Sequence, residues 1–175
     1  MKTTHVLILY GLPCSGKSGL VNELTDYHSV AVDTLIKRRT DDPSLSDFKN
    51  MSRDLMADII SEISAGINTN IIIEMGCLIP KASIDYLEGF LKDSNIHYLN
   101  ISLFANEDEL IRRIVKRNSD IDAGLLDAIK VDGPDYLSRF TKVFNVNKPD
   151  NTVTIDTTSK ISKQLLKEIN SFLSF

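Results

Sequence analysis

The sequence lacks any long hydrophobic run. Crossing a bilayer as a helix takes about 20 consecutive apolar residues, and the run near the start of the chain, Val6-Leu7-Ile8-Leu9-Tyr10, is far shorter. It is also too short for the apolar part of a signal peptide, and no later run approaches the length of a membrane span. We therefore expect a cytoplasmic protein without a membrane partner.

Cysteine is scarce, with only Cys14 and Cys77 in 175 residues. Neither their spacing nor the expected compartment supports a structural disulfide. The histidines are His5, His28 and His97, and they do not follow the ligand spacing of a zinc site. The sequence therefore gives no sign of a disulfide framework or of a histidine-based metal centre.

The chain has no excess of positive charge either. Its 20 lysines and arginines are outnumbered by 24 aspartates and glutamates, for a formal net charge of −4 and a pI near 5.4. This balance disfavours duplex nucleic acid as a partner, because phosphate backbones are held largely by lysine and arginine. With 42% apolar residues and no internal repeat, 175 residues suffice for one proper core. We expect a single domain over residues 1–175, and the sequence leaves the oligomeric state open.

One segment of eight residues carries a recognisable motif. It reads Gly11-Leu12-Pro13-Cys14-Ser15-Gly16-Lys17-Ser18 and matches G-x-x-x-x-G-K-[ST], the P-loop or Walker A pattern. The apolar run before it is typical of a buried strand. After it, apolar side chains recur at helical spacing, at Leu20, Val21, Leu24 and Tyr27. The motif and its surroundings predict a phosphate-binding loop between a strand and a helix.

Each motif position has a physical role in binding a nucleotide. Gly11 and Gly16 let the backbone bend so that its N–H groups point at phosphate oxygens. Lys17 reaches the β- and γ-phosphates as a compact positive charge, and the Ser18 hydroxyl is placed to ligate Mg²⁺. We therefore expect ATP and Mg²⁺ as cofactors, with the nucleotide bound by the motif and by Gly19 directly after it.

Segments with strand and helix character alternate along the rest of the chain. Strands are predicted at residues 6–10, 29–32, 70–74, 97–104 and 152–155, and helices from 16, at 34–39, from 44 to 65, from 80, from an Asn106 N-cap onward, and over 161–172. Residues 118–148 lack a strong period and contain Gly124, Gly133 and Pro134, which predicts a mobile segment with short helical pieces. The alternation predicts a three-layer α/β/α P-loop NTPase fold with a five-stranded parallel sheet and a helical lid, the lid and acceptor segment covering about 112–148.

Two acidic residues follow predicted strands at the edge where ligands of such sheets bind. Asp33 comes after the second strand and is a candidate base toward an acceptor hydroxyl, although an aspartate there also serves as a helix N-cap. Glu74 ends the third strand, where a carboxylate can hold Mg²⁺; a strand-end glutamate paired with a lysine is the alternative.

Two arginines mark the entrance to the predicted lid. Arg113 and Arg117 are four residues apart and share one helical face, from which they would close over a triphosphate and stabilise negative charge in the transition state. The alternative is an exposed face on which Glu109 pairs with Arg113.

The motif and the segment after it resemble chloramphenicol phosphotransferase and its relatives. Gly16-Lys17-Ser18-Gly19-Leu20-Val21, followed by Val32-Asp33-Thr34-Leu35-Ile36, is similar to the G-K-S-G-I-V and V-D-S-L-I of that family. Ile71-Ile72-Ile73-Glu74 resembles its I-I-I-D, Arg113-x-x-x-Arg117 its lid R-x-x-x-R, and Ile155-Asp156-Thr157-Thr158 its V-D-T-T. The similarity is close in the first third of the chain and looser beyond it.

The resemblance implies a small P-loop kinase that uses ATP and Mg²⁺. It implies that Asp33 is the base toward a substrate hydroxyl and that the turn containing Thr157 lies near the adenine. Two positions depart from the family pattern, since Asp120 stands where a further lid arginine is found and Glu74 replaces an aspartate. Residues 37–66 and 119–150 match poorly, so the antibiotic substrate does not carry over.

The sequence thus predicts a kinase that transfers the γ-phosphate of ATP to a hydroxyl of a small molecule. The proposed catalytic residues are Asp33, Lys17, Arg113 and Arg117. Within the same class, a nucleoside, nucleotide or polynucleotide 5′-hydroxyl kinase remains open, as does a toxin-like kinase acting on a cell-wall sugar nucleotide. A nucleotide-binding regulatory module that transfers nothing is the alternative from a different class.

Overall fold

The computed structural model describes residues 4–39, 45–66, 69–117 and 134–174. At its centre is a five-stranded sheet in the order β2-β3-β1-β4-β5, with every neighbouring pair parallel. The strands are β1 (His5–Gly11), β2 (Tyr27–Ala31), β3 (Asn70–Glu74), β4 (His97–Phe104) and β5 (Val153–Asp156). The predicted five-stranded parallel α/β fold is therefore confirmed.

The middle strand, β1, has the most apolar surroundings. All seven of its residues are buried, and it pairs with β3 on one side and β4 on the other. The isoleucine run of β3 is buried as well. Strands covered on both faces read as continuous β-branched and aliphatic runs, which is why the sequence pattern located these two correctly.

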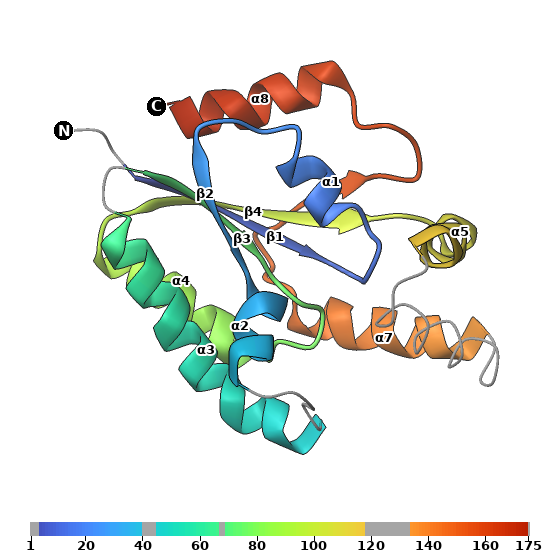
Figure 1. Cartoon of the computed structure of the whole chain (residues 1–175), viewed down its shortest axis with the longest axis horizontal. Coiled ribbons are helices and arrows are strands. Elements are labelled where there is room, and N and C mark those ends of the chain that lie inside the picture. Colours follow the sequence, from blue (N-terminus) through green and yellow to red (C-terminus); the bar gives the residue numbers. More distant parts are fainter. Residues whose placement is uncertain (1–3, 40–44, 67–68, 118–133, 175) are drawn as a thin grey trace.

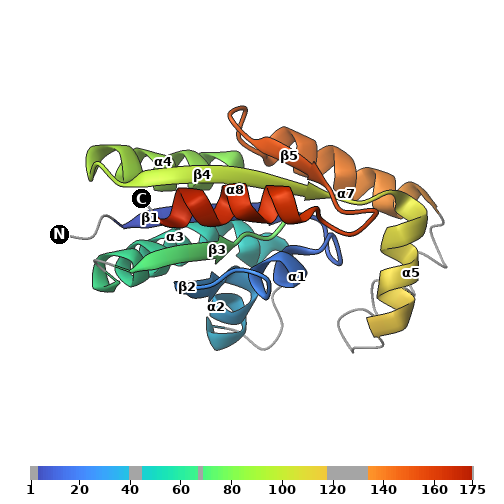
Figure 2. The same ribbon diagram turned by 90° about the horizontal axis from the view of Figure 1, so that it is seen from above.

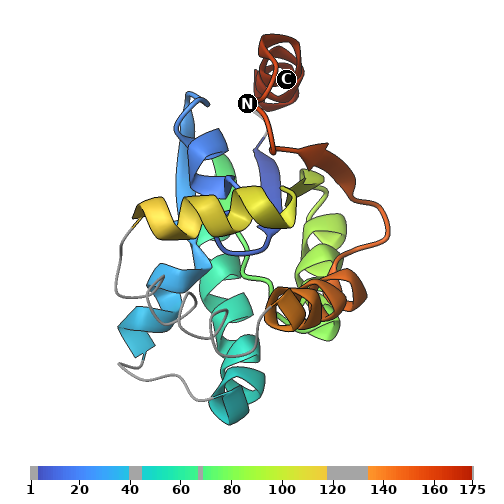
Figure 3. The ribbon, with the colours of Figure 1, turned by 90° about the vertical axis from the view of Figure 1, so that its right-hand side faces the viewer.

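Helices cover both faces of the sheet and form the outer layers (Figures 1 and 2). One face carries α1 (Lys17–Val21) and α8 (Lys163–Ser174), and the other carries α2 (Val32–Arg39), α3 (Leu45–Ala65), α4 (Lys81–Asp93) and α7 (Pro134–Asn147). The remaining helix, α5 (Glu107–Arg117), crosses in front of the strand ends (Figure 3). None of the helices within the described ranges combines the length and the apolar composition that a bilayer crossing requires.

The carboxyl ends of the parallel strands meet at one edge of the sheet, on the right in Figure 1. The phosphate loop follows β1 there, Asp33 comes shortly after β2, and Glu74 ends β3. On the other half of the sheet the segment after β4 leads into α5, and Thr157 follows β5. The fold thus brings the two carboxylates to one side of the loop and Thr157 to the other.

The first helix and second strand differ from the sequence prediction. Helix α1 has only five residues, and Tyr27 begins β2 instead of continuing the helical pattern. The apolar spacing after the loop was misleading because Leu20, Val21 and Leu24 are buried by a single turn and the bends that follow it. As β2 ends at Ala31, Asp33 lies in the first turn of α2 and is not its N-cap.

Helix α7 corrects the prediction for part of residues 118–148. Residues 118–133 lie outside the described residues, but residues 134–147 form one continuous 14-residue helix rather than a mobile stretch with short pieces. Pro134 is its first residue, a position where proline is favoured because its missing N–H has no helical partner. Leu137 and Phe144, seven residues apart, are buried on its inner face. In the sequence, the glycines and the proline obscured the helical spacing of Leu137 and Phe144, which the packing of α7 reveals.

Candidate functional site

The phosphate loop is shaped by its two glycines. Gly16 has a φ of 99°, a left-handed conformation that side chains disfavour, and it directly precedes α1. Gly11 lies against β4 so closely that a Cβ atom there would sit 2.7 Å from the Leu103 carbonyl oxygen. Helix α1 is only five residues long, so its dipole would contribute less to anion binding than that of a longer helix.

Lys17 points back over the loop. Its ammonium donates to the carbonyl oxygens of Gly11 at 2.8 Å and Leu12 at 3.1 Å. Burial lowers the pKa of Lys17, while the nearby Cys77, Asp33 and Glu74 oppose that shift. The ammonium thus contacts the loop carbonyls and lies within electrostatic reach of both candidate carboxylates.

Asp33 and Glu74 both face this part of the loop. A Cβ placed on Gly76 would lie 3.7 Å from Asp33 Oδ1, so the aspartate extends over the chain that follows β3. The Ser18 hydroxyl donates to Glu74 Oε2 at 2.8 Å, so Glu74 is held by Ser18 rather than paired as a surface ion. Asp33 itself is exposed to solvent.

Ser18 and Glu74 fit a nucleotide-bound Mg²⁺. Among the described residues, no group of three or more His, Cys, Asp or Glu side chains could hold a metal ion by itself. Magnesium bound with a nucleotide does not need such a group, because phosphate oxygens and water complete its octahedral shell. Two adjacent oxygen ligands of the hard type that Mg²⁺ prefers are therefore a suitable protein contribution.

On the opposite side of the loop, Arg113 and Thr157 form a clasp. Arg113 Nη1 donates to the Cys14 carbonyl oxygen at 3.1 Å and to Thr157 Oγ1 at 3.3 Å, and Nη2 donates to the Thr157 carbonyl oxygen. The Thr157 hydroxyl lies within hydrogen-bond distance of two carbonyl oxygens, that of Ser15 at 2.6 Å and that of Phe104 at 2.9 Å, between which its one hydrogen is shared. The clasp ties the loop to the ends of β4 and β5.

The structure also shows how α5 holds Arg113. Asn106 Oδ1 accepts from the Glu109 N–H at 2.9 Å, which confirms the predicted N-cap, and Glu109 Oε1 accepts from Arg113 Nε at 2.7 Å. The pairing of Glu109 with Arg113, which the sequence offered as an alternative, is therefore present. Arg113 also contacts the loop, through the Cys14 carbonyl oxygen. Arg117 lies in the last turn of α5, and its role toward phosphate stays a prediction.

A cleft of about 330 Å³ opens beside the clasp. Arg113 and Thr157 line it together with Gly16 and Gly19 of the loop region. Sequence analysis did not single out Lys160 and Ile161, which follow β5 and complete the wall. No local pattern marks such residues, because only the folded chain brings them beside α1.

The comparisons with known proteins bear on the fold. No protein-family model matches the sequence, and no curated protein matches it. Solved structures do match over nearly the whole chain, among them a sugar kinase from Janibacter sp. HTCC2649, 17% identical, covering 98% of this chain and 94% of its own, with a TM-score of 0.59. The chain has the fold of small kinases.

Two further matches support the same fold. APS kinase from Mycobacterium tuberculosis, in complex with AMPPNP and APS, is 12% identical and covers 100% of both chains, with a TM-score of 0.60. The tunicamycin resistance protein of Deinococcus radiodurans is 14% identical and covers 97% of this chain and 94% of its own, with a TM-score of 0.57. These similarities establish architecture, whereas activity has to be argued from the residues of this chain.

Replacing Arg113 by lysine tests the clasp. Lysine keeps the charge but loses the planar fork that contacts Cys14 and Thr157 together. We expect Arg113→Lys to destabilise the protein by about 1–3 kcal/mol, lowering the melting temperature by roughly 2–10 °C. Arg112→Lys is the matched control, since within the described residues the hydrogen bonds of Arg112 go to Glu109 on its own helix, and the change should move the melting temperature little. Equal effects of the two substitutions would contradict a clasp.

The Glu109 carboxylate gives a pH dependence of known sign. Hydrogen bonds from Arg112 and Arg113 lower its pKa from 4.5 to about 2. A depressed pKa in the folded state contributes stability above pH 4.5 that is lost as the pH falls toward 2. The melting temperatures of the wild type and Glu109→Gln should therefore differ at pH 7 and converge near pH 2. A constant difference across this range would contradict the assignment.

Proposed function

We propose that this protein is a kinase that transfers the γ-phosphate of ATP, with Mg²⁺, to a hydroxyl group of a small molecule. The observation that carries the proposal is the meeting of Lys17 with Asp33 and Glu74 at the carboxyl edge of the sheet. Phosphoryl transfer needs positive charge on the moving group, a metal and an oriented acceptor. These three residues, with Ser18, offer each of those parts.

The loop and the cleft bind different parts of the nucleotide. The loop amides and Lys17 bind the β- and γ-phosphates, and the cleft beside Arg113 and Thr157 accepts the base. APS kinase, whose fold this chain shares, was solved in complex with AMPPNP, which supports nucleotide binding by this fold. Arg117, one turn beyond Arg113, is the proposed lid charge toward the γ-phosphate.

Asp33 acts toward the acceptor. A bond forms between the acceptor oxygen and the γ-phosphorus as the bond to the β–γ bridging oxygen breaks, so ADP leaves. The acceptor proton passes to the Asp33 carboxylate. Ser18 and Glu74 would hold Mg²⁺, which neutralises charge on the β- and γ-phosphate oxygens when bound.

Among kinases, the motif resemblance favours the chloramphenicol phosphotransferase-like branch. It rests on Gly16–Val21 and Val32–Ile36, which flank the loop and contain Asp33. The acceptor belongs to a small soluble molecule with a free alcohol, and the net negative charge disfavours a duplex nucleic acid.

A panel of hydroxyl compounds tests the proposal. Antibiotics, sugars, nucleosides and other metabolites are incubated with the protein, ATP and Mg²⁺, and ADP release is followed, with the Lys17→Ala protein as blank. At least one compound class should accelerate ADP release well above the blank. Tight ATP binding without acceleration by any acceptor would favour a regulatory nucleotide-binding module instead.

Glu74→Gln tests the metal site. The amide keeps the shape of the side chain but loses its negative charge, so we expect the Mg²⁺ concentration for half-maximal activity to rise by about 10- to 100-fold. Glu62→Gln is a suitable control because Glu62 pairs with His28 at 3.5 Å, on α3. Unchanged magnesium dependence in Glu74→Gln would remove Glu74 from the metal site.

A further inference from the structure

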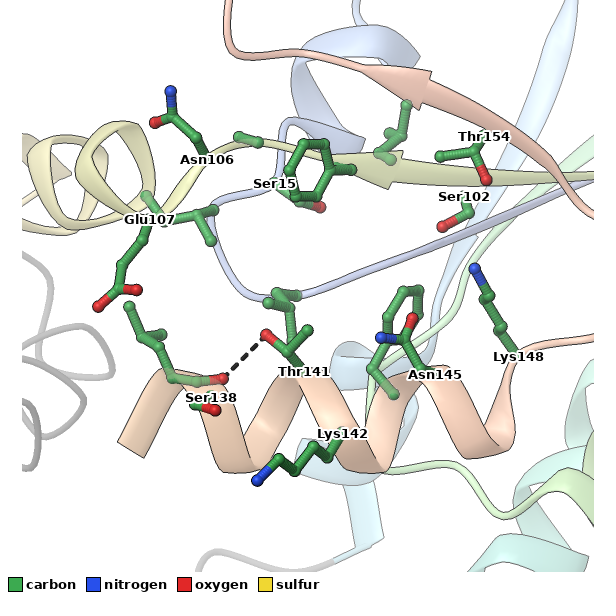
Figure 4. Close-up of a pocket in the computed structure, with 17 residues that line it drawn as sticks. Ser15, Ser102, Asn106, Glu107, Ser138, Thr141, Lys142, Asn145, Lys148 and Thr154 are labelled. Atoms are coloured by element: carbon green, nitrogen blue, oxygen red, sulfur yellow. Dashed lines mark hydrogen bonds between the residues drawn. The ribbon is translucent and has the colours of Figure 1, made fainter. Parts of the chain in front are cut away.

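A second cavity, of about 490 Å³, lies between α7 and the β4–β5 edge of the sheet (Figure 4). Its volume is in the range of small-molecule sites. It shares no lining residue with the cleft beside Arg113 and Thr157. It contains none of Lys17, Asp33 or Glu74, so these proposed catalytic and metal-binding residues lie outside it.

The walls of this cavity have an apolar part and a polar end. Leu12, Leu103 and Leu137 contribute apolar surface. At the other end Figure 4 shows the Lys148 ammonium pointing toward the strands, where the hydroxyl-bearing side chains of Ser102 and Thr154 lie. In the described part of the chain, no side-chain hydrogen bond or ion pair is found for these three residues.

Leu12 and Ser15 form the loop side of the cavity. Ser15 is 1% exposed, and its Oγ lies so close to Gly11 that a Cβ atom there would be 2.3 Å away. This hydroxyl is therefore packed against the loop, and the polar groups that the cavity offers a ligand are those of its other end.

We propose that this cavity is an effector site for a small organic anion with an apolar body. The anionic group binds Lys148 with the hydroxyls of Ser102 and Thr154, and the body packs on the leucines. Since Leu12 and Ser15 belong to the phosphate loop, a ligand here contacts the loop from behind. Ligand and nucleotide then alter each other's affinity by the same factor. Only this linkage rests on the proposed function, through nucleotide binding by the loop.

The aromatic sulfonate 8-anilinonaphthalene-1-sulfonate is a suitable probe, being a small anion with an apolar body that fluoresces in apolar surroundings. The wild type should bind it saturably, and Lys148→Gln should weaken binding by about tenfold through loss of a charge-assisted contact. Lys148→Arg should restore most of the affinity. Lys142→Gln is the matched control, because Lys142 of α7 also lines the cavity but has its ammonium turned away from the strands (Figure 4).

Three outcomes overturn the site. They are the absence of saturable binding, equal weakening by Lys148→Gln and Lys142→Gln, and loss of binding in Lys17→Ala, which would place the probe on the phosphate loop. None of these readouts needs an acceptor or turnover, so they are independent of whether the protein is a kinase.

The effector role is tested by calorimetric titration of ATP with and without saturating probe. We expect the dissociation constant of ATP to change by at least about fivefold, a coupling at the lower end of the usual range. The change should be much smaller in Lys148→Gln. An unchanged ATP affinity at saturating probe would overturn the effector role and leave the catalytic proposal untouched.

Discussion

Lys17→Ala is expected to lower turnover by about 10²–10³-fold or more. Such losses follow the removal of one preorganised group from developing charge in a transition state. The Lys17 ammonium contacts the carbonyls of Gly11 and Leu12 and lies near the carboxylates of Asp33 and Glu74. Alanine leaves the γ-phosphate without this charge. The measurement is kcat with the best acceptor from the panel.

Lys81→Ala serves as the control for this substitution. Lys81 is an exposed lysine at the start of α4, where it pairs with Asp85 at 3.0 Å. Its removal should change kcat by less than about twofold, as expected for an exposed ion pair. If Lys17→Ala also kept nearly full turnover, the phosphate loop would not be the site of transfer.

Asp33→Asn is expected to reduce kcat by about 10²–10⁴-fold while the dissociation constant for ATP moves less than about threefold. Asparagine has nearly the same shape but cannot accept the acceptor proton. Because Asp33 lies beyond β2, across the loop from the cleft beside Arg113 and Thr157, nucleotide binding should be spared. Turnover and ATP binding by calorimetry together distinguish a base from a structural role.

Asp85→Asn gives the matched comparison, since Asp85 is an exposed aspartate whose role is to pair with Lys81. It should leave both quantities near the wild-type values. A regulatory module predicts a different pattern, in which Asp33→Asn is as silent as Asp85→Asn. A loss of ATP affinity that matched the loss of turnover would instead assign Asp33 to nucleotide binding.

The sequence predicted those parts of the fold that depend on local pattern. The apolar runs of β1 and β3 indicate strands buried on both faces, and the loop motif predicts a turn between a strand and a helix. The prediction was wrong at α7 and α1, because in both the decisive contacts come from distant segments. Phe144 of α7 packs into the core that α3 and α4 share, and no neighbour in sequence reveals that.

The same distinction holds at the candidate site. The pairing of Glu109 with Arg113 follows from four-residue spacing on one helix, so the sequence could offer it. The contacts of Arg113 with the Cys14 carbonyl and Thr157 join segments 99 and 44 residues apart, and only the folded chain shows them. The roles of Asp33, Arg117 and Glu74 in catalysis stay predictions that the substitutions above address.

The most direct test is to follow the phosphorus itself. ³¹P NMR of the protein with ATP, Mg²⁺ and the best acceptor should show a phosphomonoester signal growing in equal amount with ADP. Asp33→Asn should slow both signals together. Inorganic phosphate as the only new product, or no ADP at all with any hydroxyl compound, would contradict transfer to an alcohol across the gap between Lys17 and Asp33.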